Sequence, residues 1–267
     1  MAFQSIAELF DLTGKGAVVT GGAAGIGRSI SYRLVEAGAR VMIADIDIET
    51  ATETAEKITV RVGKAEAIKA DASSPADASK VAEAAVKAFG SFDILVNNAG
   101  IYPTSAALDT SEALWDRVMD INLKGPFFYS QAAAREMIRA GNGGRIINIA
   151  SMDGMHPHME VAHYGSSKAG VIMLTKDLAL EFAPHGILVN AVAPGSIMTH
   201  GVGVEAASRA AAGKTTQELM DQFMQRMPLG RPGVPDDIAK VVLFLAGAAS
   251  DYMTGSVVLV DGGHLLS

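Results

Sequence analysis

The chain has 267 residues, of which 49% are hydrophobic and 19% are charged, and its formal net charge is −7. This size and composition fit one α/β domain, and an acidic surface argues against a nucleic-acid-binding protein, which needs a basic face. The absence of cysteine excludes disulfides and thiolate zinc sites.

The first residues of the chain show neither the basic start nor the apolar run of a secretory signal. No apolar stretch reaches the roughly 18 residues that a membrane-spanning helix requires. We therefore expect a cytoplasmic protein that acts on a small molecule and has no nucleic-acid or membrane partner.

Short apolar runs rich in β-branched residues alternate with longer amphipathic stretches along the chain. The strand-like runs lie at 16–20, 39–45, 65–70, 92–97, 144–150, 187–193 and 256–260. Helix-length stretches separate most of them, for example 25–37, 48–62 and 75–89. Because strands that are apolar on both faces are typical of parallel sheets, the alternation predicts a single-domain, doubly wound α/β fold over 1–267, with helices on both faces.

A glycine-rich turn follows the first predicted strand. The segment "TGGAAGIG" places Gly21, Gly25 and Gly27 where the next helix should begin. Glycine lets the backbone approach a pyrophosphate, and a helix N-terminus offers free N–H groups and a partial positive charge. The alternative is that a tight strand–helix turn needs glycine for its own geometry.

Asp45 ends the second predicted strand, about 20 residues past that turn. A carboxylate at this place accepts hydrogen bonds from an adenosine ribose and repels a 2′-phosphate. Arg28 and Arg40 are near in sequence, but Arg28 belongs to the helix start and Arg40 begins the second strand. The pattern favours NAD over NADP, and a plain surface aspartate is the alternative.

A helical run that starts near Ser111 meets a proline. Pro126 has no N–H and cannot bond to the carbonyl of Asn122, four residues before it. Gly125 loosens the same turn. We expect a kink that leaves the Asn122 carbonyl free, and a kink that serves packing alone is the alternative.

Tyr164 and Lys168 stand four residues apart and therefore share one helix face. A free tyrosine has a pKa near ~10, and a fixed ammonium nearby lowers that value. Lys168 would thus make Tyr164 an adequate base for the proton of a secondary alcohol. Ser151, at the end of the fifth predicted strand, could hold the substrate oxygen beside the phenol. The alternatives are an incidental surface pair and a serine that caps a turn.

The region 196–228 breaks the alternation and contains a helical stretch with Met220, Met224 and Met227. It follows the end of a strand, where such sheets bind their ligands, and this position predicts a substrate lid. A surface helix that packs on a neighbour is the alternative.

Six motifs in order carry a resemblance to a known family. They are "TGGAAGIG", "NNAG" (97–100), Asn122, Ser151, "YGSSK" (164–168) and "PGSIMT" (194–199). From about Leu12 to Gly263 the chain resembles the short-chain dehydrogenase/reductase family, in its NAD-preferring branch of chains about this long.

The resemblance implies seven parallel strands in the order 3-2-1-4-5-6-7, NAD as cofactor and a homotetramer formed through two long helices and the C-terminal edge. It also implies a catalytic group made of Asn122, Ser151, Tyr164 and Lys168, in which the Asn122 carbonyl holds a water that links the lysine to solvent. The residues implied to contact the cofactor are Gly21, Ala24, Gly25, Ile26, Gly27, Asp45, Asp71, Ala72, Asn97, Ala99, Gly100, Tyr164, Lys168, Pro194, Gly195, Ile197 and Thr199.

Three histidines, His156, His158 and His163, lie between Ser151 and Tyr164. The His-Pro-His spacing raises the question of a metal, but Pro157 makes the stretch extended and no further cluster of ligands accompanies it, so we predict no metal site. We expect these histidines to line or rim the pocket, and a polar rim of Asp153, His156 and His158 would suit a hydroxylated or carboxylated substrate.

The sequence predicts an NAD-dependent oxidoreductase that interconverts a secondary alcohol and a ketone, with a polyol, sugar or hydroxy acid as substrate. A 3-oxoacyl-type reductase is the alternative within the enzymes, although it would usually use NADPH, which Asp45 disfavours. The alternative of another class is a regulator that senses NAD without turnover. Such proteins tend to lose the tyrosine or the lysine, and this chain has both.

Overall fold

The computed structural model describes residues 3–199 and 227–266. Most of the predicted substrate lid, 200–226, lies outside the described residues. Within the described part, no helix is both long and apolar enough to cross a membrane.

Seven parallel strands form one sheet in the order β3-β2-β1-β4-β5-β6-β7, which confirms the order implied by the resemblance. Their ends differ by no more than a residue or two from the predicted runs. The strands are β1 Gly16–Thr20, β2 Arg40–Asp45, β3 Ala65–Lys69, β4 Ile94–Asn97, β5 Gly144–Ile149, β6 Ile187–Pro194 and β7 Val257–Val260. Strands β1 and β4 are buried along their whole length, whereas the edge strands β3 and β7 are only partly covered.

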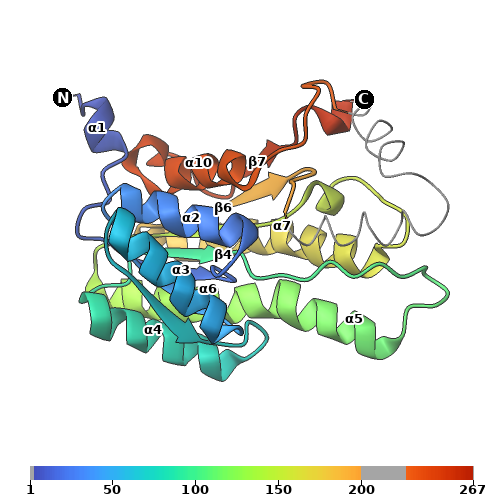
Figure 1. Cartoon of the computed structure of the whole chain (residues 1–267), viewed down its shortest axis with the longest axis horizontal. Helices are drawn as coiled ribbons and strands as arrows, with labels where there is room; N and C mark the ends of the chain where they lie inside the picture. The colour runs from blue at the N-terminus through green and yellow to red at the C-terminus, as the bar shows by residue number, and fades with distance from the viewer. Residues whose placement is uncertain (1–2, 200–226, 267) are drawn as a thin grey trace.

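Helices cover both faces of the sheet, as predicted (Figure 1). One layer consists of α2 Gly25–Glu36, α3 Ile48–Arg61 and α10 Pro235–Ala246, and the other of α4 Pro75–Phe89, α6 Gly125–Ala140 and α7 Ala162–Phe182. The helix α5 Glu112–Met119 packs against α7, and the short α1 spans Ile6–Leu9. The remaining turns are η1 Asp120–Lys124, η2 Met152–Gly154, η3 Ala183–His185, η4 Ala248–Ser250 and η5 His264–Leu266.

A buried chain of polar side chains joins the two central strands to the second helix layer. The amide of Asn97 on β4 donates to the Asn148 side chain on β5 at 2.8 Å and to Ser130 on α6 at 3.0 Å. Asn148 in turn donates to Thr175 on α7 at 2.9 Å. Because each buried polar group finds a partner, the network costs little and fixes how α6 and α7 sit on the sheet.

Parallel strands end at the same edge of a sheet, so the loops after β1, β2, β4, β5 and β6 gather there. The strand order reverses between β1 and β4, because the chain first builds outward to β3 and then returns to the other side of β1. Open α/β sheets bind their ligands in the crevice at such a reversal. The fold therefore brings the glycine-rich turn, Asp45, the NNAG loop, Ser151 and the loop after β6 to one edge.

Candidate active site

The turn after β1 is a cradle that only glycine can form. Gly21 has a φ of +61°, and a Cβ on Gly27 would lie 2.1 Å from the Gly21 carbonyl oxygen. The Asn98 amide holds this turn by donating to the same carbonyl at 2.9 Å. Helix α2 starts at Gly25, its N-cap Ala24 makes no side-chain capping bond, and its first turn contains no acidic residue. The free N–H groups and the open backbone fit a dinucleotide pyrophosphate.

Asp45 is held in place at the end of β2. Its carboxylate accepts hydrogen bonds from the backbone N–H of Ala23 at 3.0 Å and of Asp47 at 3.1 Å. The Arg40 guanidinium donates to a backbone carbonyl before β1 and is thereby turned to the opposite end of the strand. Lys69 is the register partner of Asp45 on β3, and it is a nearby cation that sequence reasoning missed.

The other predicted cofactor residues fall into three groups. Two glycines lie close to other predicted residues: a Cβ on Gly25 would be 3.6 Å from the Thr199 methyl, and one on Gly100 would be 3.6 Å from the Lys168 Nζ. Asn97 differs, because its side chain is directed into the interior network described above. The rest sit at the ends of β1 to β6 or just beyond them, namely Ile26, Asp71, Ala72, Ala99, Pro194, Gly195 and Ile197.

The helical run from Ser111 is interrupted where the sequence predicted, but by a π-helical turn rather than a sharp break. Pro126 cannot donate a hydrogen bond, and the Gly125 N–H instead reaches the Asp120 carbonyl five residues back, which closes the π turn η1. Gly125 is needed at this point, since a Cβ there would lie 2.3 Å from the Ala72 carbonyl oxygen. The turn directs the buried Asn122 toward the site.

The Asn122 side chain ties the loop after β4 to α7. Its oxygen accepts from the Ile101 N–H at 2.9 Å, and its nitrogen donates to the Ile101 carbonyl at 2.9 Å and to Ser167 at 3.2 Å. Ser167 in turn donates to the Tyr164 carbonyl at 2.7 Å. The Asn122 side chain therefore makes structural contacts that the sequence did not predict.

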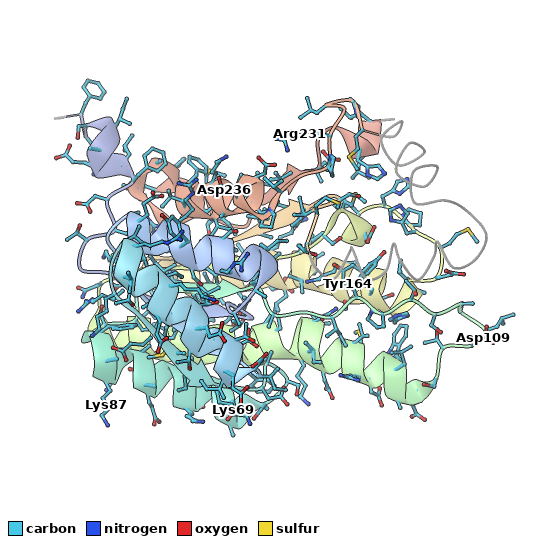
Figure 2. The ribbon with its side chains drawn as sticks, in the orientation of Figure 1. Lys69, Lys87, Asp109, Tyr164, Arg231 and Asp236 are labelled. Atoms are coloured by element: carbon cyan, nitrogen blue, oxygen red, sulfur yellow. The ribbon has the colours of Figure 1, made fainter. Side chains whose placement is uncertain are left out.

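Ser151 lies close enough to Tyr164 for its side chain to lower the pKa of the phenol. Ser151 stands two residues past the end of β5 and is buried, and its Oγ accepts from the Asp153 N–H at 3.1 Å. Figure 2 shows Tyr164 well inside the outline of the molecule, whereas Asp109 and Lys87 mark its periphery. The serine hydroxyl thus lies where it could orient a substrate oxygen beside the phenol.

Lys168 carries its ammonium in the interior. Only 4% of the residue is exposed, and its Nζ donates to the Ile149 carbonyl at 2.8 Å. The Nζ lies 5.7 Å from the centre of the Tyr164 ring. Burial lowers the pKa of Lys168 to about 8, because the charged form loses hydration.

The pKa of Tyr164 is raised, whereas the sequence predicted that Lys168 would lower it. Burial raises it above the ordinary value, the Ser151 hydrogen bond lowers it, and the nearby Asp153 and Tyr102 raise it further. The expectation that the lysine brings this pKa down is not met by the residues alone. The Lys168 ammonium is directed to the Ile149 carbonyl rather than to the phenol oxygen.

Sequence reasoning missed two contacts of the site. The Tyr102 ring, in the loop after β4, meets the Tyr164 ring edge to face with 4.5 Å between the centroids. Thr20 Oγ1, at the end of β1, accepts from the N–H groups of Asn98 at 3.0 Å and of Ala99 at 3.1 Å. Asn98 lies within the quoted NNAG motif, which is the signal that could have found it.

The three histidines take different positions. His158 Nδ1 contacts the Asp153 carboxylate, and its ring lies 5.9 Å from that of His156. His163 does not line a rim: it is fully buried in the first turn of α7, and its Nε2 bonds to the Pro103 carbonyl at 2.8 Å. Among residues 3–199 and 227–266, no group of three or more histidine, aspartate or glutamate side chains could hold a metal ion.

Comparison with known proteins shows which family the chain belongs to. A family model described as Enoyl-(Acyl carrier protein) reductase, within the short-chain dehydrogenases, matches residues 21–264. The chain is 40% identical over 260 residues to 2-dehydro-3-deoxy-D-gluconate 5-dehydrogenase from Dickeya dadantii, covering 97% of this chain and 99% of that protein. It is also 40% identical over 257 residues to galactitol 2-dehydrogenase from Agrobacterium fabrum, covering 96% and 99% of the two chains.

Solved structures show the same fold. A protein from Agrobacterium tumefaciens, assigned as a 2-deoxy-D-gluconate 3-dehydrogenase and crystallised with NADP, is 40% identical with a TM-score of 0.85, over 97% of this chain and 99% of that chain. Relatives named as 3-oxoacyl-[acyl-carrier-protein] reductases also match. The chain belongs to the short-chain dehydrogenase/reductase family and is an oxidoreductase that acts on CH–OH groups with a nicotinamide cofactor.

Proposed function

We propose that the protein is an NAD-dependent dehydrogenase in which Asn122, Ser151, Tyr164 and Lys168 form the catalytic group. The observation that carries the proposal is the convergence of three side chains: the buried Lys168 ammonium lies 5.7 Å from the centre of the Tyr164 ring, and Ser151 is close enough to the phenol to lower its pKa. The glycine cradle stands at the same edge of the sheet.

Oxidation of a secondary alcohol removes a hydride from carbon and a proton from oxygen. A nicotinamide supplies the hydride acceptor when it is bound, and its oxidised ring brings a positive charge. Tyr164, as the phenolate, takes the proton at its phenol oxygen, while Ser151 donates a hydrogen bond that holds the substrate oxygen. In the reverse direction the same phenol returns the proton to the ketone oxygen.

Lys168 and Asn122 serve this proton transfer. Because burial brings the pKa of Lys168 to about 8, its ammonium can release and regain a proton near neutral pH. Pro126 withholds the usual helical partner from the Asn122 carbonyl, which leaves that oxygen able to hold a water that connects the lysine to solvent.

The substrate class follows from the relatives, several of which are named as sugar and polyol dehydrogenases. We propose a polyol, a sugar or a sugar-derived hydroxy acid. A 3-oxoacyl-type reductase is the second candidate, because relatives with that name match almost as well. A non-catalytic NAD sensor is less well supported, since the four catalytic residues are all present.

Tyr164→Phe should lower kcat by about a thousandfold, because it removes the only proton acceptor in the mechanism. Cofactor affinity should stay near that of the wild type. The measurement is nicotinamide absorbance with a panel of polyols, sugars, hydroxy acids and a 3-oxoacyl thioester, together with a cofactor titration. Tyr252→Phe, at a fully exposed tyrosine, is the matched control. Undiminished turnover in Tyr164→Phe would reject the proposed mechanism.

Lys168→Met should abolish turnover and yet stabilise the fold. At pH 7 the lysine is protonated in both states, and burying its charge costs free energy; the gain on replacement should be on the order of 1 kcal/mol. As the pH rises from about 8 toward 10.5, the pKa of Lys168 in the unfolded chain, the wild type should become more stable. The reason is that the folded chain releases the lysine proton at lower pH than the unfolded chain does. Urea denaturation checks this, with the exposed Lys176→Met on the same helix as control. A less stable Lys168→Met at pH 7 would contradict it.

Asp45 should decide the choice between NAD and NADP. Its fixed carboxylate repels a 2′-phosphate, so Asp45→Ala should raise kcat/KM for NADP by about tenfold or more and lower it for NAD. Steady-state kinetics with both cofactors measure the ratio. Lys69→Met is the control for the neighbouring cation. A wild type that prefers NADP would show that Asp45 does not set the preference.

We also propose a homotetramer. Apolar side chains stay exposed on both helices of the α5–α7 pair, with Trp115 at 40%, Met173 at 55% and Leu180 at 79% exposure. Leu259 on the edge strand β7 is 39% exposed. Burying these residues against other copies would remove apolar surface from water. Light scattering should give the mass of four chains, and a monomer would refute the assembly.

A further inference from the structure

Asp153 and His158 form a pair that the proposed mechanism does not use. Asp153 Oδ1 contacts His158 Nδ1, and the two side chains are 7% and 30% exposed. Within the described part of the chain, no lysine or arginine forms an ion pair with Asp153. Asp153 is therefore a nearly buried carboxylate, and among the described residues its negative charge can be neutralised by the His158 imidazole.

This pair is joined directly to the residues of the proposed catalytic group. The Asp153 N–H donates to Ser151 Oγ at 3.1 Å, and Ser151 in turn is close enough to Tyr164 to lower the pKa of the phenol. The η2 turn that carries Asp153 lies tightly on α7, since a Cβ on Gly154 would be 2.8 Å from the carbonyl carbon of Lys168. A carboxylate held so rigidly acts on the phenol with a fixed field.

The sign of that field opposes the reaction. A phenol that gives up its proton becomes negative, and the Asp153 charge raises the pKa of Tyr164. The other groups that face the phenol are Lys168 from α7, with its ammonium over the ring, and Tyr102 from the loop after β4. A protonated His158 next to the carboxylate would cancel part of its charge.

Two further imidazoles contact His158. Its ring lies 5.9 Å from the ring of His156 and 6.1 Å from the ring of His264, which comes from η5. The pair thus stands where two segments meet that are more than a hundred residues apart in the chain.

We propose that Asp153 and His158 are positioning residues that set the charge against which Tyr164 ionises: the Asp153 backbone N–H orients Ser151, its carboxylate opposes the phenolate, and the imidazole screens the carboxylate. This proposal rests on the proposed dehydrogenase function. If so, the pH at which alcohol oxidation begins depends on Asp153 and His158 as well as on Tyr164.

The test is the pH dependence of kcat/KM for alcohol oxidation in two variants with opposite expected shifts. Asp153→Asn keeps the backbone contact to Ser151 and removes the charge, so the inflection at which activity rises should move to lower pH by on the order of one unit. His158→Gln keeps a donor for the carboxylate but cannot become a cation, so the inflection should move to higher pH. Asp109→Asn is the matched control, because Asp109 is exposed and lies at the periphery of the molecule (Figure 2).

Opposite shifts would support the proposal, because a merely structural defect would lower kcat without moving the two profiles apart. Profiles that coincide with the wild type in both variants, or that shift in the same direction, would overturn it. If Asp153→Asn does not fold, the expected upward shift in His158→Gln decides alone. An absence of any turnover in the wild-type panel would instead reject the dehydrogenase function, so the two failures can be told apart.

Discussion

The geometry of the candidate active site depends on one buried charge. Lys168 holds its ammonium inside the protein and donates to the last carbonyl of β5, the strand that leads directly to Ser151. This bond pins α7 to the end of the strand, and α7 also carries Tyr164 one turn earlier. An ammonium in this place is costly unless it is well bonded, and the lowered pKa of Lys168 records that cost. The same cost makes the lysine able to exchange a proton near neutral pH.

Close backbone contacts place the other parts around this point. Gly27 packs on the Gly21 carbonyl and Gly125 on the Ala72 carbonyl, at distances that leave no room for a side chain. The first contact shapes the turn for a pyrophosphate, and the second seats the π turn that presents Asn122. In both cases close backbone packing, rather than a side-chain contact, fixes where the turn lies.

The electrostatics of the phenol are a balance of several groups. Burial, Asp153 and Tyr102 raise the pKa of Tyr164, and the hydrogen bond with Ser151 lowers it. The protein alone therefore holds the tyrosine in its protonated form. An oxidised nicotinamide, when bound, would bring positive charge that favours the phenolate, as would protonated neighbours. Proton removal would then be coupled to the presence of the cofactor.

The sequence by itself determined the sheet and its helices and indicated the candidate catalytic residues, because each of these has a local sequence pattern. Strands that are buried on both faces have apolar sequences, a proline stands in the interrupted helix, and glycines stand in the turn at a strand end. Only the tertiary structure decided which side chains meet across the chain. The Asn97 side chain points inward to Asn148, and His163 is buried with its ring bonded to the Pro103 carbonyl. His158 contacts Asp153 and His264. These contacts link residues that are distant in sequence or direct a side chain to one of two faces, and no local pattern encodes that choice. For the same reason the balance of charges around Tyr164 was not predictable from its spacing to Lys168.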